Sequence, residues 1–404
     1  MHNDEYEPSW MMSNHNHAWK ENNSQRHHGL SSQPPFTYQK KTVRVESFSS
    51  VIDAFVEDDD LNFDSEEEDI MLTNNNCTSD LNAFEALLVT SSHATELQSE
   101  LLKVKMCNTA LDVHAIHDWC QGSSANVLVL VGLSIWEEHG YFAELCPKMT
   151  IRHWIEFFQL IAKGYHENSY HNEKHAADVM YSMYCLLTFG KMNTRLTPLQ
   201  LLTGLLAAAC HDIGHLGTSN ANLVKTKHPI TDAYPNTTSP LEAMHLHVTL
   251  SLLRTSECSP FRFMRHEHVQ LMESWLKKCI PATDLGHQSE LVDGLSDSLS
   301  TMDDQIVLLC AVLQASDLGH CTKPRQLHHD WARRICLEVN NKVAPTLGDS
   351  KEYRNYCASQ LGFIRACVCP LYFALHKKVD IAFAIVGLEK NIEIWQTEMV
   401  QYCK

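Results

Sequence analysis

Residues 201–220 read LLTGLLAAACHDIGHLGTSN, an apolar run followed by a cluster of histidine and aspartate. The apolar part, residues 201–209, has the length of a buried helix, and Thr197-Pro198 ahead of it supplies an N-cap and a first-turn proline. Adjacent His211 and Asp212 then stand at the end of a buried helix, where both side chains reach a common cavity. This stretch predicts a helical protein whose chemically active residues gather at helix ends.

Helix-length apolar patterns recur beyond about residue 96, and strand-like alternation is rare, which predicts an all-α, compact multi-helix bundle. Residues 151–164 form an amphipathic run that stops at glycine, and Ser239-Pro240 opens another helix. Residues 303–316 (DDQIVLLCAVLQAS) are nearly continuously apolar, as expected of a central helix. Two last helices are expected near residues 359–377 and 380–400, and loop-rich connections over residues 281–301 and 340–352.

The first 95 residues differ in composition from the rest. They are rich in Asn, His, Ser, Asp and Glu and show little apolar periodicity, so they cannot bury enough surface to offset the entropy of ordering. Residues 1–100 carry 19 acidic and 5 basic side chains, which account for −14 of the net charge of −17. We predict a mostly disordered acidic tail over residues 1–95 and one folded domain over residues 96–404.

An acidic run within this tail, residues 58–69 (DDDLNFDSEEED), superficially imitates a calcium-binding loop. Phe63 stands where such a loop needs glycine for its turn, and no convincing amphipathic helix flanks the run. We interpret it as a solvated acidic segment. The hypothesis that Ser65 is a phosphorylation site, or part of an autoinhibitory tail, stays open.

Charge and composition narrow the classes of partner. The residues after 100 sum to a charge of only −3, so the chain lacks the basic stripe that would bind a nucleic-acid polymer. The N-terminus has no basic flank and apolar run, and the 15 cysteines show no recurring C-x-x-C pair, so we expect a reducing, cytoplasmic setting. No transmembrane segment is expected, because the most apolar short stretch, residues 127–135, is far below the ~20 residues that span a bilayer.

A second segment, residues 170–179 (YHNEKHAADV), carries two histidines and an aspartate. His171 and His175 are four residues apart, so on a helix both imidazoles emerge on one face. Asp178 is close enough to orient a ring by accepting its second N–H. An isolated histidine pair of this kind is more typical of a surface or a core than of a metal site.

Three further polar residues are candidates for binding a cation or its waters. His215 comes three residues after Asp212 and can serve a second metal ion or its water. Glu242 in LEAMH (241–245) is expected to be a buried carboxylate that faces metal-bound waters. Asp317 closes an otherwise apolar helix, and because an unpaired buried charge is costly, a bound cation is the economical explanation.

Six blocks occur in the order in which a known family carries them: YHNEKHAADV (170–179), HDIGHLGTSN (211–220), LEAMH (241–245), ATDL (282–285), SDLGHCTKP (316–324) and SQLGFI (359–364). Over about residues 100–404 the chain resembles the catalytic domain of class I cyclic-nucleotide phosphodiesterases, of the HD-domain metal-dependent phosphohydrolases. The resemblance implies hydrolysis of the 3',5'-cyclic phosphate of cAMP, cGMP or both to the 5'-monophosphate, which terminates cyclic-nucleotide signalling. A small cyclic nucleotide is then the expected partner, and a homodimer stays open.

The family pattern also implies a metal centre with two ions. The first, a zinc ion, is held by imidazole and carboxylate, which zinc favours. Asp212 also bridges to a second ion, magnesium or manganese, which keeps several waters. The implied zinc ligands are His175, His211, Asp212 and Asp317, and the waters of the second ion are tied to His215, Glu242 and Thr283.

The same resemblance implies a reaction and a nucleotide pocket. The two ions share and activate a hydroxide for in-line attack at phosphorus, and His171 protonates the departing O3' as general acid. Gln360 is implied to bind the purine, because its amide both donates and accepts hydrogen bonds, and Phe363 to stack on the base. Ile335 is the opposing apolar wall, and Tyr170, Leu285 and Leu318 are the other implied substrate-binding residues.

Four departures from the family pattern stand out. Gly214 replaces an acidic residue of many relatives, and Met244 replaces the first of two adjacent histidines. His320-Cys321 occupies the place of a common Asn-Pro pair, which removes a contact often associated with adenine. The connection from Ile335 to Gln360 is short. These changes leave nucleotide preference and inhibitor response open.

Two alternative functions stay open from the sequence. The motif HDIGH also occurs in phosphohydrolases that cleave cyclic dinucleotides or nucleoside triphosphates, which the block around Gln360 and Phe363 disfavours. The other alternative is a catalytically silent module that binds cyclic nucleotide and regulates a partner. The presence of all four implied zinc ligands and of His171 argues against it.

Overall fold

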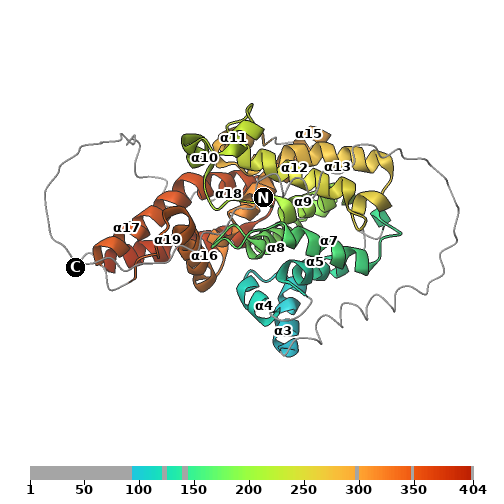
Figure 1. Cartoon of the computed structure of the whole chain (residues 1–404). Helices are drawn as coiled ribbons and strands as arrows, with labels where there is room; N and C mark the ends of the chain where they lie inside the picture. Colours follow the sequence, from blue (N-terminus) through green and yellow to red (C-terminus); the bar gives the residue numbers. More distant parts are fainter. Residues whose placement is uncertain (1–92, 121–124, 139–143, 296–299, 347–349, 402–404) are drawn as a thin grey trace. The chain divides into compact units, whose positions relative to one another are not determined.

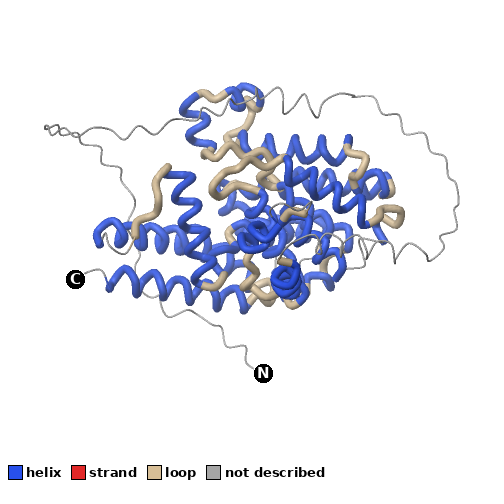
Figure 2. The backbone as a smooth tube through the Cα atoms, turned by 60° about the horizontal axis from the view of Figure 1, so that its bottom comes forward, coloured by secondary structure: helices blue, strands red, loops and turns tan. Residues whose placement is uncertain are grey.

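The computed structural model describes residues 93–120, 125–138, 144–295, 300–346 and 350–401. Within these ranges all regular structure is helical, as Figure 2 shows, and the all-α prediction is confirmed. The acidic run 58–69 and nearly all of the predicted tail lie outside the described residues. The domain boundary near residue 95 therefore stays a prediction.

Figure 1 labels most of the helices that the structure describes. They are α3 (Ala94–Lys105), α4 (Val113–Cys120), α5 (Val127–Glu138), α7 (Ile151–Lys163), α8 (Glu173–Phe189), α9 (Pro198–Cys210), α10 (Asn220–Thr226), α11 (Pro229–Ala233), α12 (Pro240–Thr255), α13 (His266–Cys279), α14 (Gln288–Asp293), α15 (Met302–Asp317), α16 (Arg325–Asn340), α17 (Ser350–Phe363), α18 (Cys369–His376) and α19 (Ala382–Gln401). The predicted boundaries of α7, α9 and α15 and the predicted start of α12 agree with these ranges to within about one residue.

The C-terminal helices differ from the prediction. Helix α17 begins at Ser350, not near residue 359, and runs through a π-helical segment, Ile364–Val368, into α18 without a break. The first residues of this helix fall in the segment 340–352 that was expected to be a loop-rich connection, and Tyr353, Tyr356 and Cys357 are buried at helical spacing. Pro370, which cannot donate to the carbonyl four residues earlier, follows the π-helical segment. Such segments are frequent at functional sites.

Helices α8, α9 and α15 pack against one another in the core. A Cβ on Gly204 of α9 would lie 2.4 Å from Met183 Cε on α8 and 2.8 Å from Leu309 Cδ1 on α15. Glycine therefore permits the close approach of all three helices. Thr197 caps α9 by accepting the N–H of Gln200, and Thr301 caps α15 by accepting that of Asp304.

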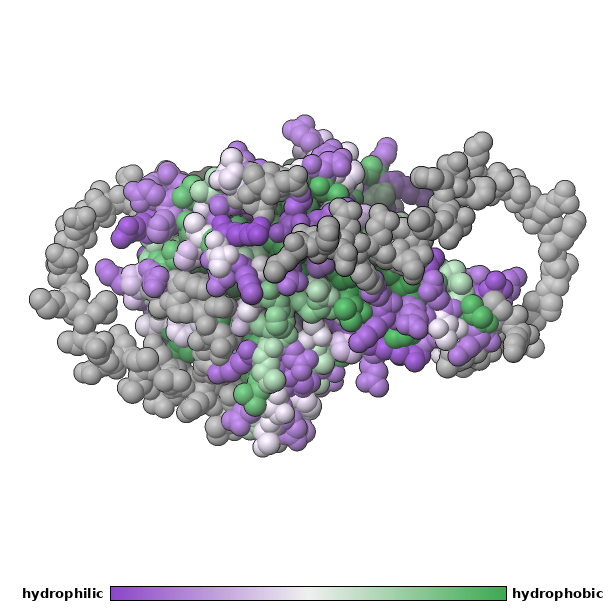
Figure 3. All heavy atoms as spheres, turned by 180° about the vertical axis from the view of Figure 1, so that it is seen from behind, coloured by the Kyte–Doolittle hydropathy of each residue, from purple (hydrophilic) through white to green (hydrophobic). Residues whose placement is uncertain are grey.

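One described run, Lys351–His376, is long and apolar enough to cross a membrane by length and composition alone, with 39% of its most apolar window buried inside the protein. A core helix of a soluble protein passes the same test, so the expectation of no transmembrane segment stays a prediction. On the face drawn in Figure 3, hydrophobic and hydrophilic side chains are interspersed. No disulfide bond joins two of the described cysteines.

Candidate active site

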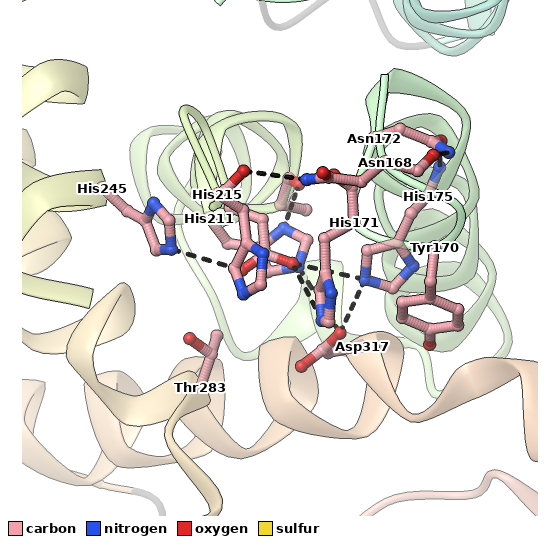
Figure 4. Close-up of polar contacts among 12 residues, drawn as sticks. Asn168, Tyr170, His171, Asn172, His175, His211, His215, His245, Thr283 and Asp317 are labelled. Atoms are coloured by element: carbon pink, nitrogen blue, oxygen red, sulfur yellow. Dashed lines mark hydrogen bonds and ion pairs between the residues drawn. The ribbon is translucent and has the colours of Figure 1, made fainter. Parts of the chain in front are cut away.

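Three helix ends converge on one cluster of histidine and aspartate side chains (Figure 4). The side chain of Asn172 accepts two backbone N–H groups at the start of α8, which places His175 in the first turn of that helix. His211 directly follows the last residue of α9, and Asp317 is the last residue of α15. The packing of α8, α9 and α15 therefore brings together residues far apart in the sequence.

His175, His211, Asp212 and Asp317 offer ligand atoms that all lie within 4.8 Å of one another. Asp317 Oδ1 is 3.0 Å from His175 Nε2 and 3.4 Å from His211 Nε2. Asp212 Oδ2 is 3.1 Å from His211 Nε2 and 3.6 Å from His175 Nε2. His211 Nδ1 donates to the Ala208 carbonyl at 2.9 Å, so Nε2 is the ring nitrogen that faces the carboxylates. The structure thus places the four predicted zinc ligands around one centre.

The two carboxylates of this centre are ionised. Burial favours their neutral form, but the neighbouring histidines outweigh it and hold the pKa of Asp212 and of Asp317 well below the usual range. Imidazole nitrogens and carboxylate oxygens are donors that zinc accepts. A divalent cation among them would also neutralise the buried negative charge. The residues present therefore fit a metal ion.

Asp212 belongs to a second cluster, with His215 and His245. His215 Nδ1 accepts the N–H of Gly217 at 3.0 Å, so the proton of this ring is on Nε2. Burial lowers the pKa of His215 well below its usual value and keeps the ring neutral. His215 can therefore donate to a water or a phosphate oxygen. His245 Nε2 lies 3.6 Å from Asp212 Oδ1, and His245 was not among the residues predicted from the sequence.

His171 lies beside the histidine-aspartate cluster, and its ring is held by a residue that the sequence did not indicate. His171 Nδ1 donates to Glu338 Oε1, while Glu338 Oε2 accepts the backbone N–H groups of Tyr170 and His171 at 2.6 and 3.1 Å. Burial opposes protonation, but the charge of Asp212 and the hydrogen bond to Glu338 raise the pKa of His171. Its Nε2 lies 3.9 Å from Asp212 Oδ2. A ring so placed can act as a general acid.

Asn168, also missed, joins the two histidine-bearing loops. Its Nδ2 donates to the carbonyls of His171 and His215 at 2.9 and 2.8 Å. Gly217 has a φ of +66°, and a Cβ there would lie 2.8 Å from Asn168 Oδ1. Gly214 has a φ of +78°, a region that side-chain-bearing residues rarely adopt. Glycine at position 214 therefore suits the backbone conformation found there.

Glu242 and Thr283 each have a hydrogen-bonding partner within the protein. Asn220 Nδ2 donates to Glu242 at 2.7 Å, and burial raises the pKa of Glu242 to about 7. The Thr283 hydroxyl donates to the Ile280 carbonyl at 2.8 Å, which leaves its oxygen free to accept, and the side chain points towards the cluster (Figure 4). The predicted contacts of Glu242 and Thr283 with metal-bound waters stay predictions.

Asp178 is paired with a buried lysine. Its Oδ1 lies 2.7 Å from Lys323 Nζ, and both side chains are buried. The predicted hydrogen bond from a histidine ring to Asp178 stays a prediction. Because Lys323 follows shortly after Asp317, the pair joins α8 to the segment that follows α15.

The predicted nucleotide-binding residues lie on several elements. Gln360 and Phe363 are three residues apart on α17 and share a face of that helix. Tyr170 is buried, with its ring 4.4 Å from that of His175 and 5.3 Å from that of Trp331. The other predicted nucleotide-binding residues differ in solvent exposure: Ile335 is half-buried, Leu318 is buried and Leu285 is exposed. The pocket that these residues are predicted to form stays a prediction.

The His320-Cys321 departure is part of a buried hydrogen-bonded chain. Trp395 Nε1 donates to His328 Nε2 at 2.8 Å, so the proton of His328 is on Nδ1, which lies 3.1 Å from His320 Nδ1. With Cys321 these histidines form a set that could hold a metal ion. However, His328 Nδ1 carries a proton in this arrangement and cannot be a ligand. The histidine at 320 instead has a hydrogen-bonding partner on α16.

The chain is similar in sequence to proteins of known function. Residues 170–386 match the family described as 3'5'-cyclic nucleotide phosphodiesterase. A curated relative, the dual 3',5'-cyclic-AMP and -GMP phosphodiesterase beta of Plasmodium falciparum, is 26% identical over 270 residues, which are 61% of this chain. The match spans only 23% of that relative's length.

Two solved structures of the rhodopsin phosphodiesterase of the choanoflagellate Salpingoeca rosetta share the fold. The phosphodiesterase domain of the RhoPDE fusion protein has a TM-score of 0.61 and 23% identity, and covers 68% of this chain and 92% of its own. The second structure of that domain has a TM-score of 0.61 and 22% identity, and covers 68% and 88%. Because the family match extends over more than half of the chain, the protein belongs to the 3'5'-cyclic nucleotide phosphodiesterase family.

Proposed function

We propose that this protein hydrolyses the 3',5'-cyclic phosphate of cAMP, cGMP or both and releases the 5'-monophosphate. The observation that carries the proposal is the cluster of His175, His211, Asp212 and Asp317, whose ligand atoms lie within 4.8 Å of one another, next to His171. Two carboxylates and two imidazoles suit a metal ion, and a protonated histidine beside them suits a leaving alkoxide. Hydrolysis of a cyclic phosphodiester uses both the metal ion and the proton donor.

The proposed role of His171 follows from its hydrogen bonds. Its Nδ1 is committed to Glu338, so only Nε2 is available to a substrate. Hydrolysis with P–O3' cleavage leaves an alkoxide, which is a poor leaving group unless it is protonated. The raised pKa keeps the ring in the form that can supply this proton. We assign His171 Nε2–H as the general acid.

The proposed cofactors follow from the donor types. A zinc ion would be held by His175, His211, Asp212 and Asp317, and a magnesium or manganese ion by the other oxygen of Asp212. Divalent ions bound there would lower the pKa of a water and neutralise phosphate charge. His215, with its proton on Nε2, would donate to that water or to the phosphate. Glu242 and Thr283 would accept from waters of the second ion.

The nucleotide selectivity proposed here is a dual one. Gln360 presents an amide that can donate and accept, so a rotated amide can pair with either purine. Phe363 would stack on the base without reading its edge. The curated relative from Plasmodium falciparum, named as a dual cAMP and cGMP enzyme, supports the same choice.

The proposal is tested with the purified full-length chain, zinc and magnesium or manganese, and each cyclic nucleotide. We expect turnover by the native chain and none by Asp317→Ala or His171→Ala. The two variants should differ in metal content: Asp317→Ala should lose zinc, whereas His171→Ala should keep it and keep its circular dichroism spectrum. Binding of cyclic nucleotide without turnover by the native chain would favour a silent binding module. Turnover of cyclic dinucleotides alone would favour another phosphohydrolase of the HD type.

A further inference from the structure

A cavity of about 680 Å³ lies where the starts of α9 and α15 meet α13 (Figure 1). Thr197 and Pro198 line it at the start of α9, and Met302 lines it as the first residue of α15. The opposite ends of these two helices carry His211 and Asp317. Because the 13 residues of α9 span about 20 Å, the cavity is separate from the histidine-aspartate cluster.

The walls of this cavity are mostly apolar. Large apolar side chains from five segments line it: Leu145, Leu199, Phe263, Leu271, Trp275 and Met302. Two of them, Leu271 and Met302, are 40% and 48% exposed. Small-molecule sites have volumes of about 300–1,000 Å³ and are lined mainly by apolar and aromatic side chains. The cavity therefore suits a ligand with an apolar body, which would remove the surface of Leu271 and Met302 from water.

Three basic side chains line the same cavity, against one acidic side chain, Glu144. They are Lys148, Arg262 and Arg265. Among the described residues, neither Lys148 nor Arg265 has an ion pair, and Arg262 has only a long one, 3.9 Å to Glu257, whose side chain is 94% exposed. The whole chain has a net charge of −17. This local excess of positive charge favours an anionic ligand.

Two features at the start of α13 suit a ligand with a polar, negatively charged head. Arg265 is the N-cap of α13 and its side chain makes no capping hydrogen bond, so the first N–H groups of the helix lack a side-chain cap at the positive end of the helix dipole. His268 lines the cavity, and its Nδ1 is shielded from solvent and has no hydrogen-bonding partner among the described residues. A polar ligand head would supply the partner that a buried ring nitrogen requires.

We propose that this cavity binds a single-chain organic carboxylate, such as a medium-chain fatty acid. The apolar walls receive the chain, and Arg262 and Arg265 bind the head, because guanidinium matches a carboxylate in a planar, bidentate arrangement. Methionine is unbranched and adapts to a flexible chain. A small inorganic anion would leave Leu271 and Met302 exposed, and a neutral hydrocarbon would leave the basic side chains without a partner. The site is additional to the proposed hydrolysis and does not depend on it.

The test measures binding of decanoate to the full-length chain by isothermal titration calorimetry. Decyltrimethylammonium has a similar chain with the opposite charge, and acetate has the same head without the chain. Arg262→Gln/Arg265→Gln removes both guanidinium groups from the cavity. Its matched control is Lys351→Gln/Lys390→Gln, which makes the same change of charge at exposed positions on α17 and α19.

A second variant tests the apolar wall independently. Leu271→Glu places a carboxylate in the cavity at an exposed position, where the fold should tolerate it. Val386→Glu is the matched control, because Val386 is 47% exposed on α19 and does not line the cavity. Asp317→Ala reports whether decanoate binds at the histidine-aspartate cluster instead. Thermal unfolding of each variant shows that it is folded.

We expect saturable binding of decanoate by the native chain, by both matched controls and by Asp317→Ala. The dissociation constant should rise by about 10-fold or more in Arg262→Gln/Arg265→Gln, because hydrogen bonds between charged groups are lost. It should rise by a similar factor in Leu271→Glu, because the new carboxylate repels the head and occupies the wall. Acetate and decyltrimethylammonium should bind at least about 10-fold more weakly than decanoate.

Two results would overturn the proposal. The first is equal binding of decanoate and decyltrimethylammonium, or binding that survives in the arginine and leucine variants and is lost in Asp317→Ala. The second is displacement of decanoate by a synthetic peptide of residues 58–69 that binds more tightly than decanoate itself, since this would assign the cavity to an acidic peptide.

Discussion

His171 Nδ1 donates to the carboxylate of Glu338, a residue 167 positions further along the chain at the last turn of α16. The other oxygen of Glu338 accepts the backbone N–H of His171 itself. One carboxylate therefore fixes both the ring and the loop that carries it. This contact leaves only Nε2 of His171 available to a substrate.

Glu338→Gln should slow the reaction because His171 then protonates the leaving group less well. The amide holds the ring less firmly and no longer favours its protonated form, so kcat for cAMP should fall by about 100-fold or more, within the usual range of general acid catalysis. An aryl phosphodiester such as bis(p-nitrophenyl) phosphate needs no proton on its leaving group, and its turnover should fall much less. Steady-state kinetics with both substrates make the comparison. Equal losses for the two substrates would show that Glu338 acts on structure alone.

Lys323→Met should destabilise the fold by about 3–5 kcal/mol, because it leaves the buried Asp178 carboxylate without its partner. The double variant with Asp178→Leu should recover much of this loss. Burial raises the pKa of Asp178, and a raised carboxyl pKa lowers stability as pH rises above the unfolded value. The loss in Lys323→Met should therefore be larger near pH 8 than near pH 5. Denaturant unfolding at both pH values measures it, and a single variant as stable as the native chain would contradict the ion pair.

Gly387→Ala should weaken the packing of α19 on the segment after Asp317. A Cβ at this position would lie 2.0 Å from the carbonyl oxygen of Thr322, a backbone atom that cannot turn aside. We expect a loss of about 1–3 kcal/mol or more in the free energy of unfolding. Gly362→Ala is the matched control, since nothing lies within 4 Å of its added Cβ, and it should stabilise α17 by about 0.5–1 kcal/mol. Similar effects of the two changes would argue against this packing.

Phe363→Ala should raise KM for cAMP and cGMP by similar factors, because stacking does not read the edge of the base. Loss of an aromatic platform costs about 1–3 kcal/mol per base, or roughly 10–100-fold in KM. Gln360→Ala should also raise KM, but by factors that differ between the two purines. Initial-rate kinetics decide, and unchanged KM values in Phe363→Ala would remove that residue from the nucleotide pocket.

Most of the fold was predictable because local signals agreed with tertiary packing. Thr197-Pro198 and the apolar run after it marked α9 from end to end, and residues 303–316 marked α15. The start of α17 was missed because charged residues on its exposed face outnumber the buried Tyr353 and Tyr356. Periodicity over one or two turns is a weak signal when the apolar positions are few.

The site was predictable where residues occur in short blocks and not where distant helices meet. Glu338 lies in no such block, and its role depends on the packing of α16 against the loop of His171. His245 stands inside the quoted block LEAMH, three residues from Glu242 on one face of α12, and this spacing could have indicated it. Its tautomer could not be predicted, because it is set by a carbonyl on the loop after α9.

Product analysis tests the central claim most directly. The full-length native chain is incubated with zinc, magnesium or manganese, and cAMP or cGMP, and the nucleotides are separated by chromatography. We predict formation of the 5'-monophosphate, its loss on treatment with a chelator and its return when metal is restored. Recovery of intact cyclic nucleotide, or release of the 3'-monophosphate, would contradict the account.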